Sequence, residues 1–311
     1  MTVAFVFPGQ GSQSVGMQAD LASNYPVVQQ CYAQASEVLG FDLWDLVQNG
    51  PAEKLDETVN TQPAMLTAGV STWRTWQAIG GPLPAMMAGH SLGEYSALVA
   101  SGALAFADAV RLVRRRAELM QGAVPAGEGA MAAILGLGDD AVLEVCEAAS
   151  GNGVAEAVNF NSPGQVVVAG ERAAIENLVG LAKAAGARRA MMLAVSVPAH
   201  SSLMRPAGDE LAESIDATAF SEPAVSVVCA VDGTVYDGAD DVRQRMKKQV
   251  YSPVRWVRTV NHMAGDGITS IVECGPGKVL AGLVRRIDRD LATNCIDSAD
   301  ALQAIKDGAG E

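Results

Sequence analysis

The chain has 311 residues, of which 49% are hydrophobic, so it is long and apolar enough to bury a sizeable core. It carries 22 Lys and Arg against 35 Asp and Glu, and the net charge of −13 excludes a general nucleic-acid binder and disfavours adhesion to anionic membranes. The five cysteines and three histidines lack metal-ligand spacing, and neither a signal-peptide pattern nor an apolar run of about 20 residues is present. We therefore expect a cytoplasmic protein with no metal site and no membrane-spanning segment.

Short apolar runs alternate with helical patterns in the first part of the chain and again near its end. Residues 3–7 form an apolar run that stops at Pro8-Gly9, as a buried strand does, and residues 24–39 have helical character before a polar loop. Further predicted elements are a helix from residues 60–63 to 79, a strand at 84–89, helices at 92–100 and 108–123, and strands at 225–229, 271–274 and 294–296. Strands that alternate with helices predict an α/β fold with a mainly parallel sheet.

The middle of the chain has a different pattern. From residue 129 to residue 195 the order is strand, helix, strand, strand, helix, strand, which is typical of a ferredoxin-like α+β unit. Segments that contain Gly or Pro flank this unit on both sides. We therefore predict a discontinuous large α/β domain, residues 1–126 and 198–311, interrupted by an inserted small subdomain of residues 127–197.

Residues 89–93 read Gly-His-Ser-Leu-Gly and match the G-x-S-x-G pattern of a serine nucleophile. The match follows a predicted strand and opens a predicted helix, which is the context that the pattern requires. The glycines let strand and helix approach each other, and the start of the helix offers free N–H groups to a developing oxyanion. The sequence therefore predicts Ser91 as a nucleophile, with a chance Gly-Ser turn as the alternative.

A serine nucleophile needs a base, and the chain has three histidines to supply one. His90 is adjacent to Ser91 and is expected to point elsewhere, and His262 lies on a predicted amphipathic helix and is expected at the surface or in packing. His200 lies in a loop between the small subdomain and the next helix, from which it can reach a cleft. It is the best candidate, although ordinary α/β-hydrolases place this histidine late in the chain, after the acid.

Two glycine-containing loops have to be weighed as phosphate sites. Residues 7–13 follow a strand, but Ser14 stands where G-x-G-x-x-G needs a glycine, and residues 275–278 lack the spacing of a Walker A loop. Nucleotide binding is therefore disfavoured. The first loop can still face a ligand, because ligands of α/β folds bind beyond the carboxyl ends of the strands.

Arg116 lies on the apolar side of its predicted helix, whereas Arg111, Arg114 and Arg115 share the polar side with Glu118. A buried guanidinium needs an anionic partner or a set of hydrogen bonds. Two interpretations stay open on this pattern alone: an internal salt bridge, or bidentate binding of a substrate carboxylate.

Six motifs in order along the whole chain resemble the malonyl-CoA:acyl carrier protein transacylase family of fatty-acid synthesis. They are Phe-Pro-Gly-Gln-Gly-Ser-Gln at 7–13, Thr-Gln-Pro-Ala at 61–64, Gly-His-Ser-Leu-Gly-Glu-Tyr at 89–95, Asn-Phe-Asn-Ser-Pro-Gly-Gln at 159–165, Val-Pro-Ala-His at 197–200 and Gly-Pro-Gly-Lys at 275–278. The resemblance implies a hydrolase-like α/β core with an inserted ferredoxin-like subdomain, which agrees with the pattern of elements.

The resemblance also implies roles for the residues that match. Ser91 matches the nucleophile and His200 matches its base, which a backbone carbonyl at the position of Gln249 orients in place of a carboxylate. Gln10 and the N–H group of Leu92 match the oxyanion hole.

Three further residues match substrate-binding positions. Arg116 matches the arginine that binds the malonyl carboxylate, and Asn159 and Asn161 are expected to line the cleft from the small subdomain. The implied reaction moves a malonyl group from malonyl-CoA through a malonyl-serine ester to the phosphopantetheine thiol of acyl carrier protein. No cofactor is expected beyond CoA as part of substrate and product, and a monomer is expected.

Three rival interpretations remain: an ester hydrolase, a non-catalytic acyl-binding subunit, and the malonyl-transfer subunit of a malonate decarboxylase. Both expected partners, CoA and acyl carrier protein, are anionic, so the negative charge of the chain has to be reversed near the cleft. The candidates for this basic rim are Lys183, Arg188, Arg189, Lys247, Lys248, Arg285 and Arg286.

Overall fold

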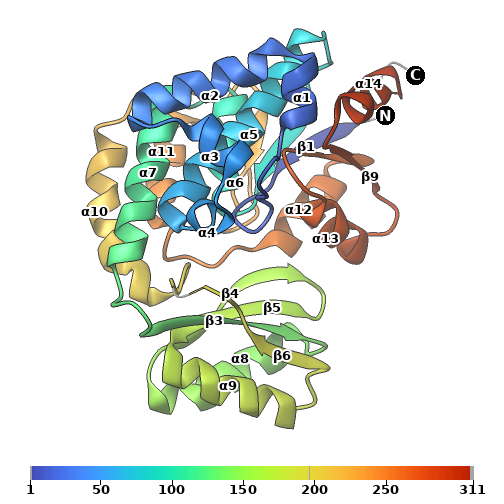
Figure 1. Cartoon of the computed structure of the whole chain (residues 1–311). Coiled ribbons are helices and arrows are strands. Elements are labelled where there is room, and N and C mark those ends of the chain that lie inside the picture. The colour runs from blue at the N-terminus through green and yellow to red at the C-terminus, as the bar shows by residue number, and fades with distance from the viewer. Residues whose placement is uncertain (1, 196, 309–311) are drawn as a thin grey trace.

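A computed structural model of the chain describes residues 2–195 and 197–308 (Figure 1). Its larger sheet has five strands, all parallel, in the order β7-β2-β1-β8-β9. The strands are β1 (Val3–Phe7), β2 (Met86–Gly89), β7 (Ser226–Val228), β8 (Ser270–Cys274) and β9 (Ala292–Ile296). The predicted parallel α/β sheet is confirmed. Strand β1 has β2 on one side and β8 on the other, so the strand order changes direction at β1. Ligands of α/β folds bind in the crevice beyond the carboxyl ends of the strands at such a point, which here is at the ends of β1 and β2.

Alternate residues of the strands pack against different sets of helices, because successive side chains point to opposite faces. Phe5 and Phe7 belong to a core with helices of the first half of the chain, whereas Ala4 and Val6 pack with the helices after residue 255. The helices around the large sheet are α1 (Ala19–Asn24), α2 (Pro26–Leu39), α3 (Leu43–Asn49), α4 (Ala52–Leu55), α5 (Thr58–Ala78), α6 (Gly93–Ala100), α7 (Phe106–Gly122), α10 (Arg205–Asp216), α11 (Gly238–Gln249), α12 (Trp256–Gly265), α13 (Val279–Ile287) and α14 (Ala299–Gly308).

Two predicted segments differ from the structure. The polar loop expected after residue 39 contains α3 and α4, because Leu43 and Leu46 reach the core and Asp42 caps the first of these helices. Helix α5 begins at Thr58, so Pro63 lies inside it. Proline lacks the N–H group that would bond the carbonyl of Val59, and a guanidinium nitrogen of Arg114 donates to that oxygen instead, at 3.0 Å.

The middle of the chain forms a separate antiparallel sheet in the order β4-β5-β3-β6. Its strands are β3 (Gly129–Leu135), β4 (Ala155–Ser162), β5 (Gln165–Glu171) and β6 (Arg189–Met192), and its helices are α8 (Asp139–Ala149) and α9 (Arg172–Ala184). Both helices cover the face turned away from the large part of the molecule (Figure 1). The strand order is that of a split β-α-β unit, so the predicted ferredoxin-like subdomain is confirmed as a fold. Its proposed limits at residues 127 and 197 stay predictions, and residue 196 lies outside the described residues.

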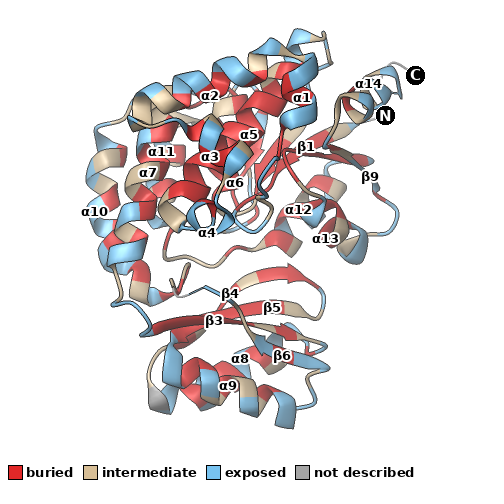
Figure 2. Cartoon of the chain, in the orientation of Figure 1, coloured by how far each residue is buried: buried red, intermediate tan, exposed pale blue. Residues whose placement is uncertain are grey.

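Burial follows the two sheets (Figure 2). The other face of the small sheet carries Met131, Val158, Val167 and Ala169, which pack with Ala199 of the loop before His200. Two short 3-10 helices lie at Ser150–Asn152, after α8, and at Ser202–Met204, before α10. Within residues 2–195 and 197–308, no helix is both long enough and apolar enough to cross a membrane.

Candidate active site

Ser91 lies at the sharp turn between β2 and α6, with a backbone φ of 53°, in the left-handed region that side chains other than glycine rarely adopt. The glycines around it leave no room for a side chain. A Cβ added at Gly89 would lie 1.9 Å from the carbonyl carbon of Gly93, and one added at Gly93 would lie 2.0 Å from the backbone oxygen of Phe7. The turn therefore holds the serine hydroxyl out at the end of the sheet, as the sequence pattern predicts.

His200 meets Ser91 from a loop 109 residues further along the chain. The Oγ atom of Ser91 lies 2.6 Å from Nε2 of His200. The Nδ1 atom lies 3.0 Å from the backbone oxygens of both Gln249 and Ser252, which only accept hydrogen bonds. These partners assign the ring hydrogen to Nδ1, so the serine hydroxyl donates to Nε2. The imidazole is thus oriented by two carbonyl groups, and no carboxylate among the described residues bonds to it.

The surroundings of His200 keep its ring neutral. Burial, followed by the positive charge of Arg116, lowers the pKa of His200 to about 3. A backbone φ of 65° and a hydrogen bond of 3.0 Å from its N–H group to the carbonyl of Val250 fix the loop that carries it. A neutral imidazole with a free Nε2 lone pair can accept the proton of Ser91, which is the state that a general base needs.

Arg116 on α7 is 1% exposed and reaches the same place. Its Nη1 donates to Oε1 of Gln62 at 2.8 Å, and its Nη2 donates to Oε1 of Gln249 at 3.1 Å. Nη2 also lies 3.4 Å from Oγ of Ser91. Among the described residues no carboxylate lies within 4.0 Å of the guanidinium, and its Nε has no hydrogen-bond partner. The internal salt bridge weighed from the sequence is therefore not formed, and the guanidinium lies beside the nucleophile without a carboxylate in direct contact.

The side chain of Gln249, at the end of α11, links these groups. Its Nε2 donates to the backbone oxygen of Ser91 at 2.7 Å and to Oε2 of Glu94 at 2.9 Å. Sequence reasoning missed both Glu94 and Gln62 as site residues. The available signal is the same for each: a polar side chain in a helix stretch that is otherwise buried, which has to be matched by another polar group.

The predicted oxyanion-hole residues flank the nucleophile. Leu92 directly precedes α6, and its backbone N–H group has no hydrogen-bond acceptor among the described residues, whereas the N–H groups of Gly93 and Glu94 bond to the carbonyls of His90 and Ser91. The loop after β1 closes against the same turn, because a Cβ added at Gly9 would lie 2.6 Å from the carbonyl oxygen of His90 and 3.7 Å from the nitrogen of Leu92. Gln10 follows directly and is exposed. The geometry places the residue before Gln10 against Leu92, and the role of Gln10 and Leu92 stays a prediction.

The two asparagines of β4 differ in what they contact. Asn161 accepts a hydrogen bond of 2.8 Å at Oδ1 from Nε2 of His90, which also packs edge-on against Trp256. Asn159 pairs with Val254 of the large part, and no hydrogen-bond partner of its Oδ1 is found among the described residues. The small subdomain therefore reaches the nucleophile turn through Asn161, while Asn159 is half-buried close by.

The comparison with known proteins assigns the chain to a family. A model of the acyl transferase domain matches residues 4–300. The chain belongs to the acyl transferase family. It is 53% identical to the malonyl CoA-acyl carrier protein transacylase of Escherichia coli (strain K12) over 301 residues, and this alignment covers 97% of each chain.

Solved structures of family members have the same fold. The crystal structure of an acyl carrier protein S-malonyltransferase from Vibrio cholerae is 51% identical, with a TM-score of 0.96 over 98% of this chain and 100% of the other. A malonyl-transacylase in complex with its type II PKS acyl-carrier protein is 48% identical, with a TM-score of 0.98 over 99% of this chain and 100% of that one.

The second glycine-containing loop of this family member, residues 275–278, precedes α13. The N–H groups at the start of α13 face the buried carboxylate of Glu273, which accepts from Ala281 at 2.8 Å. Burial raises the pKa of Glu273. A carboxylate of the protein itself therefore occupies the N–H groups at this helix start, and the expectation that the loop binds no nucleotide stays a prediction.

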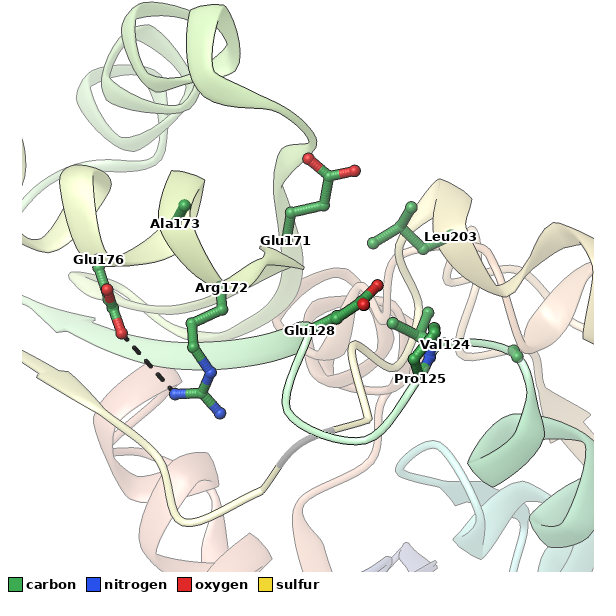
Figure 3. Close-up of a pocket in the computed structure, with 9 residues that line it drawn as sticks. Val124, Pro125, Glu128, Glu171, Arg172, Ala173, Glu176 and Leu203 are labelled. Atoms are coloured by element: carbon green, nitrogen blue, oxygen red, sulfur yellow. Dashed lines mark ion pairs between the residues drawn. The ribbon is translucent and has the colours of Figure 1, made fainter.

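A separate surface pocket lies where the chain enters the small subdomain (Figure 3). It is lined by Ala123, Val124, Pro125, Glu128, Glu171, Arg172, Ala173, Glu176 and Leu203. Arg172 is held there by Glu176 at 3.8 Å and by the carbonyl of Gly127 at 2.6 Å. None of Ser91, His200 and Arg116 lines this pocket, so it is distinct from the candidate active site.

Proposed function

We propose that this chain transfers the malonyl group of malonyl-CoA to the phosphopantetheine thiol of acyl carrier protein, as a step of fatty-acid biosynthesis. One observation carries the proposal: Ser91 lies 2.6 Å from a neutral His200 and 3.4 Å from a buried Arg116 that has no carboxylate partner among the described residues. The site thus combines an activated nucleophile with an unpaired cation for an acidic acyl group. The names of the relatives support the same reaction.

The first half-reaction forms an ester on the enzyme. Oγ of Ser91 attacks the thioester carbonyl of malonyl-CoA while its proton passes to Nε2 of His200. The N–H groups of Leu92 and Gln10 stabilise the oxyanion, and one such donor is worth about 3 kcal/mol. The C–S bond then breaks, CoA takes the proton from His200, and malonyl-Ser91 remains.

The second half-reaction runs the same steps with a different nucleophile. The phosphopantetheine thiol gives its proton to Nε2 of His200, and its sulfur attacks the carbonyl of the malonyl ester. The C–O bond to Ser91 breaks, and the serine oxygen takes the proton back from His200. The product is malonyl thioester on the carrier, and the free enzyme is restored. All proton transfers use side chains of one chain, so the proposed reaction needs no second subunit, cofactor or metal, and a monomer remains part of the proposal.

Recognition of the carrier is expected to depend on basic residues at the cleft. Of the seven candidates, Lys247 pairs with Asp216, and Arg286 donates to Oε1 of Gln165 of the small subdomain at 2.5 Å. The others lie on α9, β6, α11 and α13 or beside them, so they come from both parts of the molecule. Arg286 is the candidate that best fits a rim between the two parts.

A cytoplasmic location remains part of this proposal, since CoA thioesters and the carrier have to be supplied to the same site.

The covalent intermediate gives the direct test. The wild-type chain mixed with malonyl-CoA is expected to gain the mass of one malonyl group and to pass it to holo acyl carrier protein. Ser91→Ala is expected to show no adduct. Ser96→Ala is the matched control, because this serine lies on α6, the helix that follows the nucleophile turn, and its buried hydroxyl finds no hydrogen-bond partner among the described residues.

Three results would contradict the proposal. An adduct that persists in Ser91→Ala would place the nucleophile elsewhere. Rapid loss of the malonyl group to water without any thiol would indicate an ester hydrolase. Transfer only to the carrier subunit of a malonate decarboxylase, and none to acyl carrier protein, would assign the chain to that system.

A further inference from the structure

We propose that Glu94 is a positioning residue that sets which way the amide of Gln249 points and thereby prepares Arg116 to bind an acidic acyl group. Glu94 lies in the first turn of α6 and is fully buried. Among the described residues its carboxylate bonds to neither Ser91 Oγ nor Arg116. The inference rests on the proposed function and adds a determinant of its substrate choice.

The three groups that bond to the carboxylate of Glu94 are all donors. Oε1 accepts from the backbone N–H group of Ala230 at 2.9 Å and from the hydroxyl of Tyr236 at 2.7 Å. Oε2 accepts from Nε2 of Gln249 at 2.9 Å. An amide side chain has one donor end and one acceptor end, and a carboxylate oxygen accepts only the donor end. Glu94 therefore fixes Nε2 of Gln249 on its own side.

This orientation decides what Arg116 meets. With Nε2 turned toward Glu94 and the backbone oxygen of Ser91, the Oε1 atom of Gln249 faces Nη2 of Arg116 at 3.1 Å. The flipped amide would turn a donor toward the guanidinium and an acceptor toward the carbonyl of Ser91, so both contacts would become repulsive. The acceptor end of Gln249 thus holds Arg116 in place while Glu94 and the backbone oxygen of Ser91 accept the donor end.

The same arrangement leaves the charge of Arg116 available. A carboxylate directly on the guanidinium would compete with the substrate carboxylate for the same N–H groups. Here one amide separates the two charged groups, so Glu94 contributes an attractive charge without occupying the N–H groups that bind the substrate. Gln62, the other partner of Arg116, is also a neutral amide acceptor, at 2.8 Å.

The test is Glu94→Gln, which keeps the shape but turns one oxygen into a donor. Since Ala230 and Tyr236 retain the remaining oxygen, the new NH₂ group faces Nε2 of Gln249. The expected result is a loss of about 10- to 100-fold in kcat/KM for malonyl-CoA, because a hydrogen bond to a charged buried group is misaligned. Transfer from acetyl-CoA, which has no carboxylate to bind, is expected to fall less than about threefold. The quantity to follow is the malonyl-to-acetyl ratio, corrected for the fraction of enzyme that forms an acyl adduct.

Two further variants separate positioning from a structural role. Glu273→Gln is the matched control, because Glu273 is equally buried and lies on β8 away from Gln249, so its ratio is expected to equal that of the wild type. Gln249→Met removes the amide through which Glu94 acts. In that background, Glu94→Gln is expected to change the ratio less than about twofold, since a residue that acts only through another shows no independent effect.

The outcomes distinguish the inference from the function on which it rests. A wild-type chain that transfers malonyl, together with an unchanged ratio in Glu94→Gln or an equal further fall in the Gln249→Met background, would overturn the positioning role alone. A wild-type chain that forms no malonyl adduct would overturn the proposed function as well. If Glu94→Gln does not fold, Glu94→Asp provides the same readout, because the shorter side chain withdraws the carboxylate from Gln249 while keeping its charge.

Discussion

Removal of the buried arginine gives the sharpest prediction. Arg116→Ala deletes a guanidinium that is 1% exposed and bonded to two amide oxygens, with no carboxylate within 4.0 Å among the described residues. Malonyl-CoA would lose its charged partner in a site that water reaches poorly. A hydrogen bond to a charged group contributes about 1.5–3 kcal/mol, so the loss of a two-pronged contact is expected to reach about 3 kcal/mol. That corresponds to about 150-fold in kcat/KM.

The assay compares malonyl-CoA with acetyl-CoA in the same variant. Acetyl transfer uses Ser91 and His200 but not the carboxylate contact, so it is expected to change far less. Arg115→Ala is the control, since this neighbour is 42% exposed in its side chain and pairs with Glu210 at the surface. An equal loss for both substrates in Arg116→Ala would refute the reasoning, because the arginine would then act on the shared chemistry and not on the acyl group.

Two further predictions concern pH and packing. The pKa of His200 is held at about 3, against 6.5 for an ordinary histidine, so single-turnover acylation is expected to show no inflection near pH 6.5. The unfolded histidine takes up its proton at the higher pH, so the free energy of unfolding should fall as pH drops from about 6.5 toward 3. This slope should become shallower in His200→Ala, where the buried His90, whose pKa is also lowered, still contributes in the same direction. Gly93→Ala is expected to lower stability by several kcal/mol in denaturant unfolding, because its Cβ would lie 2.0 Å from the oxygen of Phe7. Gly180→Ala, in an open position inside α9, is the contrasting case, and its free energy of unfolding should rise by about 0.5–1 kcal/mol. Unchanged stability in Gly93→Ala would contradict the packing argument.

Local patterns along the chain were sufficient to predict the architecture. The strand patterns and the G-x-S-x-G turn depend on nearest neighbours, so the parallel sheet, the ferredoxin-like unit and the context of Ser91 followed from the sequence. The spacing of apolar residues along α7 likewise predicted that Arg116 lies on the buried side of this helix. The short helices α3 and α4 were missed, because each gains its stability from contacts with the core and hardly any from its own sequence.

Contacts between distant segments were beyond the reach of pattern reasoning. The choice between a salt bridge and a free guanidinium at Arg116 depended on which side chains surround it, and those come from α5 and α11. Glu94 and Gln62 were missed for the same reason. Their polar character within a buried helix stretch is a local signal, but their partners lie in distant segments, 155 positions away in the case of Glu94 and Gln249.

The way His200 is oriented bears on why a transferase can outcompete water. Two backbone carbonyls accept from its Nδ1, where many hydrolases use a carboxylate, and burial beside Arg116 disfavours the protonated ring. A base of this kind is weak. It is adequate for the attack of Ser91 on a reactive thioester, and for a carrier thiol, whose pKa is comparable to the value of about 8.5 for cysteine. It is poorly suited to deprotonating water, with a pKa of about 15.7, for attack on the less reactive oxygen ester. We therefore expect the malonyl enzyme to react much faster with a thiol than with water at neutral pH, and a rate of hydrolysis equal to the rate of transfer would contradict this reasoning.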